Sequence, residues 1–112
     1  MKFLIPILLA AASLSATPPR SDSQRTFTGT ISDDVCARDG HAAMRMGPTD
    51  AECTRLCVLY HGSNYVLDAA NDAYVLSDQK TPEKFAGQKV TVTGTLNAKT
   101  MTITVTSIVA AK

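Results

Sequence analysis

The chain lacks the sequence signatures of the common enzyme classes. It contains no glycine-rich phosphate loop, no Gly-x-Ser-x-Gly, no His-Glu-x-x-His and no Cys-x-x-Cys-His haem attachment. The Cys-x-x-Cys motif of dithiol oxidoreductases does not occur either. We therefore predict that the protein is not an enzyme, and we assign no residue a catalytic role.

The chain also has no marked excess of charge of either sign. Eleven basic residues stand against ten acidic ones, and the formal net charge is +1 at pH 7. The basic residues are scattered along the sequence rather than clustered. Because affinity for nucleic acid comes largely from neutralising phosphates, this composition predicts no nucleic-acid binding.

No apolar run is long enough to remain in a membrane. The almost unbroken apolar segment 3–14 falls short of the roughly 20 residues that a span needs. Lys2 precedes this segment and small residues follow it, which is the arrangement of a secretory signal peptide. We predict a signal peptide over 1–16, a secreted or periplasmic protein, and no stable membrane span after cleavage.

The rest of the chain is predicted to form one small domain. Residues 17–24 are rich in proline and serine and are expected to be a flexible lead-in. Residues 25–112 can bury a single modest core, near the size at which a disulfide or a metal adds needed stability. We expect a monomer that binds an unidentified ligand or a partner in the cell envelope.

Two segments alternate between apolar and threonine positions, as half-buried strands do. In the first, Phe27, Gly29 and Ile31 share one face. The second, 90–96, repeats the pattern with Gly94 on its apolar face. A glycine on that side of a strand permits the sharp bend of a barrel corner.

Three more strands and a short helix complete the prediction. Segments 65–68 and 73–77 form a hairpin over 69–72, and 81–87 forms a single helical turn with Thr81 as its cap. A last strand begins near Met101 and changes parity at a bulge near Ser107. Five strands with a helix between the third and fourth predict a mainly β fold, a small five-stranded OB-like barrel.

One inserted helix is expected between the first two strands. Thr49 and Glu52 form a capping box and Gly62 is a natural stop, so the helix covers 50–61. Its helical spacing places four residues on one stripe, which should be the buried face. These residues are Cys53, Leu56, Cys57 and Tyr60.

The three cysteines are an odd number for an oxidising compartment. The leading interpretation is a disulfide from Cys36 to either Cys53 or Cys57, which would pin an irregular segment 32–48 onto the helix. Such a bridge closes a loop of about 20 residues and adds on the order of 3 kcal/mol. The expected function is then a disulfide-stapled, non-enzymatic binding or interaction module.

The alternative is a periplasmic metal-binding protein. Cys36, His41, Cys53 and Cys57 would form a Cys3His set for zinc or copper. The thioethers of Met44 and Met46 would favour copper. A third interpretation is a thiol activated by His41, with Asp33 or Asp34 orienting the histidine. It is the weakest, because apolar surroundings raise a thiol pKa.

Several motifs together resemble a family of small secreted bacterial proteins of unknown function. The shared pattern is a Gly-Thr-Ile-Ser-Asp strand, a Cys with a downstream His, a Cys-x3-Cys helix and a closing Val-Thr-Gly-Thr strand. Here these motifs fall at 29–33, Cys36 with His41, 53–57 and 92–95. The resemblance implies export and a small β-rich fold, and it implies no activity.

Overall fold

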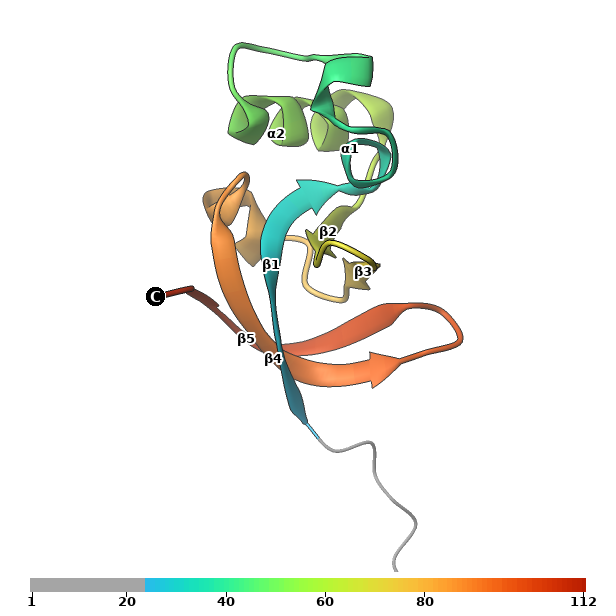
Figure 1. Cartoon of the computed structure of the whole chain (residues 1–112), viewed down its shortest axis with the longest axis vertical. Helices are drawn as coiled ribbons and strands as arrows, with labels where there is room; N and C mark the ends of the chain where they lie inside the picture. Colours follow the sequence, from blue (N-terminus) through green and yellow to red (C-terminus); the bar gives the residue numbers. More distant parts are fainter. Residues whose placement is uncertain (1–23) are drawn as a thin grey trace, which may run out of the picture.

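The protein is described from a computed structural model, which covers residues 24–112. The predicted signal peptide 1–16 and all but the last residue of the predicted lead-in 17–24 lie outside these residues. The fold is mainly β, with a helical insertion above one end of the sheet (Figure 1). The five strands are β1 Arg25–Asp33, β2 Tyr65–Asp68, β3 Ala73–Leu76, β4 Lys89–Asn97 and β5 Thr102–Ala110.

The strands form one mixed sheet that closes in a ring in the order β1-β2-β3-β5-β4. Strand β1 pairs antiparallel with both β2 and β4, and β4 pairs antiparallel with β5. The pairing of β3 with β5 is parallel and closes the ring. The structure thus confirms a mainly β, five-stranded fold.

The predicted alternation of β1 is present in the structure. Phe27 and Ile31 are buried inside the ring, and Thr26 and Thr28 are exposed. Gly29 is required by a close approach of two strands, because a Cβ there would collide with the carbonyl oxygen of Asp68. Gly94 meets the carbonyl oxygen of Thr104 in the same way. The two glycines therefore let neighbouring backbones approach closely on the apolar face.

The predicted bulge near Ser107 is confirmed. Thr93 pairs with Ser107, but the next residue, Gly94, pairs with Val105, so Thr106 is left without an opposite residue. This extra residue moves Ile108 back to the buried face of β5. The ring is filled by aliphatic side chains, and the most completely buried are Ile31, Leu67, Leu76, Val90, Val92 and Ile103.

Helix α2 (Asp50–His61) forms over the predicted residues. The Thr49 hydroxyl accepts a hydrogen bond from the Glu52 N–H at 3.2 Å, and Gly62 ends the helix in the left-handed conformation with φ 64°. No helix within residues 24–112 is both long and apolar enough to cross a membrane. The insertion helix thus follows the capping signals of its sequence.

The segment 32–48 is not irregular, contrary to the prediction. It holds helix α1 (Asp34–Asp39) and the 3-10 helix η1 (His41–Met44). The Asp33 carboxylate starts α1 by accepting hydrogen bonds from the N–H groups of Val35 and Cys36, each at 3.2 Å. Six residues are too few to show a helical apolar period, so only this cap marked the helix in the sequence.

Two further predictions need correction. The 3-10 helix η2 (Thr81–Phe85) is not capped by Thr81, because the Asp78 carboxylate accepts hydrogen bonds from the N–H groups of Lys80 and Thr81. Tyr60 does not share the buried stripe of α2, since it is 69% exposed. Thr54 is fully buried instead, so the packed face of α2 is turned toward Cys53, Thr54 and Cys57.

Candidate metal centre

The structure brings the three cysteines together within the helical insertion. Cys36 lies on α1, and Cys53 and Cys57 lie one turn apart on α2. All three are buried, and together they form a small cluster separate from the core of the ring. The sulfurs of Cys36 and Cys53 are 3.7 Å apart. The helix cysteines therefore meet Cys36, as the sequence predicted.

Backbone groups from the end of η1 and from the segment after it contact Cys53. Its sulfur lies 3.3 Å from the carbonyl oxygen of Met44, to which the thiol donates, and it accepts from the N–H of Met46 at 3.4 Å. Met46 also places its thioether sulfur 3.8 Å from the sulfur of Cys57. Met44 contributes its carbonyl to the cluster, and its side chain is 41% exposed. Of the two predicted thioethers, only that of Met46 is in contact with a cysteine sulfur in the described part of the chain.

His41 joins one side of the cluster. Its ring lies near two of the thiols: ligand atoms of Cys36, His41 and Cys53 are all within 4.8 Å of one another. The Nδ1 atom of His41 is buried and has no hydrogen-bond partner among residues 24–112. A buried polar atom without a partner is unfavourable, so this nitrogen is available for a ligand.

A second group lies on the other side of Cys36. Here ligand atoms of Asp33, Cys36 and Cys57 lie within 4.8 Å of one another. The four predicted ligands therefore do not surround a single point: Cys57 belongs with Asp33 rather than with His41. Cys36 belongs to both groups, which makes it the central residue of the cluster.

Asp33 is the functional residue whose place the sequence reasoning missed. We expected Asp33 or Asp34 to orient the histidine, but Asp33 faces the cysteines, and Asp34 lies 3.3 Å from the N–H of Asn64, from which it accepts. Asp33 is fully buried, and its Oδ1 has no hydrogen-bond partner in the described part of the chain. Aspartate is a preferred N-cap residue, and an N-cap at Asp33 places its carboxylate beside the first helical turn, which carries Cys36. This signal could have identified Asp33 as a member of the cluster.

The cluster favours protonated thiols in the metal-free protein. Burial raises the pKa of the Cys36 thiol, and the nearby Asp33 carboxylate and Cys53 thiol raise it further. Burial also raises the pKa of Cys57, with a further contribution from the charge of Asp33. Both effects disfavour the thiolate, because it would be a second negative charge in a poorly hydrated site.

The three cysteines are free thiols in the structure. The 3.7 Å between the Cys36 and Cys53 sulfurs is a contact distance, longer than the roughly 2.05 Å of a disulfide bond. Of the pairings we predicted, this contact favours Cys36 with Cys53.

Comparison with protein-family models, with curated proteins and with solved structures gives no match for this chain. The resemblance to small secreted proteins therefore stays a prediction. Fold and site together define the class: a small, mainly β protein whose helical insertion encloses a cluster of thiols.

Proposed function

We propose that this protein binds one thiophilic metal ion, zinc or copper, within its helical insertion. The observation that carries the proposal is the group formed by Cys36, His41 and Cys53, whose ligand atoms lie within 4.8 Å of one another. The imidazole in this group has a buried Nδ1 with no partner in the part of the chain that is described. Two thiols and an imidazole are a ligand set that both metals accept.

The sulfur spacing fits such an ion. Tetrahedral zinc with Zn–S bonds of about 2.3 Å separates two sulfur ligands by about 3.8 Å. The sulfurs of Cys36 and Cys53 are 3.7 Å apart. A metal could therefore replace the thiol protons without moving α1 away from α2, and His41 already lies in the same group of ligand atoms.

The thioether of Met46 favours copper over zinc at the Cys57 side of the cluster. Its sulfur is 3.8 Å from that of Cys57, and thioether sulfur is a ligand of Cu(I) but a rare one of zinc. Asp33, by contrast, offers a hard oxygen to the same side. The direct way to decide between the metals is to measure both affinities.

A second candidate function is supported by the contact between Cys36 and Cys53. A disulfide there, joining positions 17 apart in sequence, would add about 3 kcal/mol and staple α1 to α2. The protein would then be an exported, non-enzymatic binding module. In both cases we propose an OB-like barrel as the scaffold, supported by the ring order β1-β2-β3-β5-β4 with the short helix η2 between β3 and β4.

One preparation distinguishes the two functions. The exported protein is purified without reductant, and its intact mass, its free thiols and its bound metal are measured. Three free thiols after chelation, with one equivalent of zinc or Cu(I) taken up on titration, would support the metal function. One free thiol, a mass lower by two hydrogens and no metal uptake would reject it and support the staple.

His41 provides the specific test of the site. His41→Ala should weaken metal binding by about tenfold or more, because it removes one ligand. His61→Ala is the matched control, since His61 is exposed at the end of α2 and belongs to neither group of possible ligands. Equal affinities for the two variants would exclude His41 as a ligand.

A further inference from the structure

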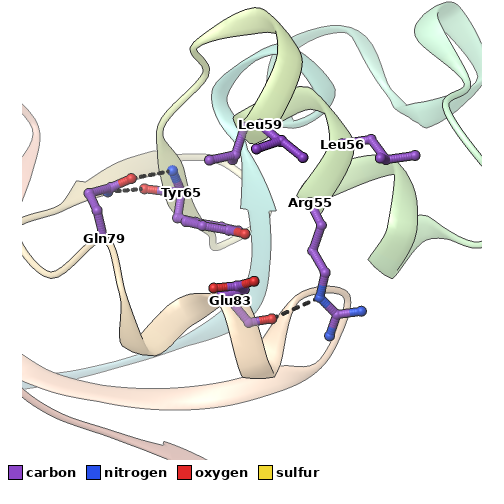
Figure 2. Close-up of a pocket in the computed structure, with 7 residues that line it drawn as sticks. Arg55, Leu56, Leu59, Tyr65, Gln79 and Glu83 are labelled. Atoms are coloured by element: carbon purple, nitrogen blue, oxygen red, sulfur yellow. Dashed lines mark hydrogen bonds between the residues drawn. The ribbon is translucent and has the colours of Figure 1, made fainter.

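A second site lies on the side of α2 turned away from the thiols. A pocket of about 230 Å³ opens between α2, the start of β2 and η2 (Figure 2). Its lining includes Arg55, Leu56 and Leu59 from α2, Tyr65 from β2, and Glu83 from η2. None of these residues belongs to the cysteine cluster, so a ligand of this pocket would not depend on the metal.

The polar floor of the pocket is held in place by hydrogen bonds. The side-chain amide of Gln79 accepts from the Tyr65 N–H at 2.7 Å and donates to the Tyr65 carbonyl at 2.9 Å. Gln79 also donates to the carbonyl of Leu76 at 2.8 Å, which fixes the amide itself. The hydrogen bonds of Tyr65 in the described residues thus use its backbone, and its phenol points into the pocket toward Arg55 and Glu83 (Figure 2).

Two opposite charges face this pocket without pairing. The Arg55 Nε donates to the backbone carbonyl of Glu83 at 2.9 Å, which fixes the guanidinium, and its two terminal nitrogens make no hydrogen bond with any other part of residues 24–112. Within residues 24–112, ion pairs shorter than 4.0 Å join only Arg38 with Asp39 and Arg45 with Asp50. The Arg55 guanidinium and the Glu83 carboxylate therefore stand in one small pocket, each without a charged partner there.

The remaining wall is aliphatic. Leu56, Val58 and Leu59 line the α2 side, and the side chain of Leu59 is 70% exposed. Leu59 therefore offers an apolar contact surface at the edge of the pocket, next to its polar residues. The volume is below the roughly 300 to 1,000 Å³ of pockets for drug-sized molecules, so the occupant must be small.

We propose that this pocket binds a free α-amino acid with an aliphatic side chain, such as leucine. The ligand carboxylate pairs with the Arg55 guanidinium and accepts from the Tyr65 phenol. The ligand ammonium pairs with the Glu83 carboxylate, and the aliphatic side chain packs on Leu56 and Leu59.

The two charges select this class of ligand. An anion without an ammonium group would leave Glu83 facing its negative charge, and a cation without a carboxylate would face Arg55. A ligand that carries both charges close together satisfies both residues, and a free α-amino acid carries both on one carbon. The pKa of Tyr65 is raised by burial and then by the charge of Glu83, with Arg55 acting in the opposite direction, so the phenol lies near both charges and is a donor at neutral pH.

Titration calorimetry of the full exported protein tests the proposal. Leucine should bind with one-to-one stoichiometry and a Kd of about 1 mM or tighter. Leucinamide, which lacks the carboxylate, and 4-methylpentanoate, which lacks the ammonium, should each bind at least about tenfold more weakly. The same titrations in the presence of a chelator show whether binding is independent of metal.

A pair of neighbouring substitutions provides the control. Glu83→Gln should weaken leucine binding by about tenfold or more, because it removes the partner of the ammonium, and it should strengthen binding of 4-methylpentanoate, because it removes the negative charge that opposes the lone carboxylate. Lys84→Gln should bind like the parent, since the Lys84 ammonium lies over the Phe85 ring and outside the pocket. Glu83 is exposed, so its substitution should not alter the fold.

Three results would overturn the proposal. The first is no leucine binding at several millimolar. The second is binding of 4-methylpentanoate as tight as that of leucine, because Glu83 would then play no part. The third is tighter binding of a leucine-containing dipeptide, which would identify the occupant as a peptide rather than a free amino acid.

Discussion

Cys36 and Cys53 place their sulfurs 3.7 Å apart, and this contact joins α1 to α2. Cys36 is also close to Cys57 and Asp33, so it belongs to both groups of possible metal ligands. Helices α1 and α2 therefore meet at Cys36, and a substitution of this residue has consequences for any function of the cluster.

The shared position of Cys36 predicts an order among the cysteine variants. Cys36→Ser should lower metal affinity by about 100-fold or more, because it removes a ligand from either group. Cys57→Ser should cost less, since Cys36, His41 and Cys53 remain. Competition against a chromophoric chelator measures both affinities, and a greater loss in Cys57→Ser would place the ion at the Asp33 side instead.

Gln79 should be among the most important polar residues for stability. Gln79→Ala removes three hydrogen bonds and leaves the N–H of Tyr65 without its partner. We expect a loss of about 2 to 4 kcal/mol in the free energy of unfolding, measured in urea. Gln88→Ala is the comparison, because Gln88 is exposed, and it should stay within about 0.5 kcal/mol of the parent.

Thr54 offers a stabilising substitution. Its side chain is fully buried on α2, and its hydroxyl has no hydrogen-bond partner among the described residues. Thr54→Val replaces the hydroxyl by a methyl of similar volume, so unfolding should cost about 1 kcal/mol more. Thr54→Ser keeps the hydroxyl and loses the methyl, and it should destabilise the protein. A lower Tm for Thr54→Val than for the parent would show that the hydroxyl has a partner in solution.

Asp78 predicts a pH dependence with a definite sign. Hydrogen bonds from Thr81 and Lys80 lower the pKa of its carboxyl below the ordinary value of 3.8. A lowered folded-state pKa means that the contribution is fully present above the unfolded-state pKa and is lost as the pH falls through the folded-state pKa. Asp78→Asn should therefore lower the Tm most above pH 4 or so, and the difference from the parent should shrink below it.

Thermal unfolding from pH 2 to 6 measures this difference. A gap between Asp78→Asn and the parent that stays constant over the whole range would show that the charged carboxylate contributes nothing beyond its amide replacement.

The strands and α2 could be predicted because their signals are local. Threonine alternation around Phe27 and Ile31 marks a half-buried strand wherever it occurs, and Thr49 with Gly62 marks the two ends of a helix. The position of Cys36 against α2 could be predicted as well. Cys53 and Cys57 share the predicted buried face of the helix, so a cysteine that pairs with either of them has to approach that face. These inferences required no knowledge of the strand order.

The details of the sites were less predictable because they depend on tertiary structure. Tyr60 satisfies the helical spacing of the buried stripe, but the sheet meets α2 on the side of Thr54, so Tyr60 is exposed. Arg55 and Glu83 are separated by 28 positions and belong to different helices. Nothing in either local sequence indicates that they face the same pocket.

Asp33 is the last residue of β1 and also the cap of α1, with no residue between the two elements. The position of β1 in the sheet therefore determines where Asp33 and Cys36 lie in the thiol cluster. A slip of β1 by one residue against β2 would turn every side chain of the strand to the opposite face, and it would carry Asp33 out of the cluster and rotate Cys36 with it. The pairing of Asp33 with Tyr65 thus determines the orientation of Cys36, although Cys36 belongs to no strand. Substitutions elsewhere in the ring that keep this register should leave the cluster in place. A single residue inserted in β1, by contrast, would displace Asp33 and Cys36 although no residue of the cluster is substituted.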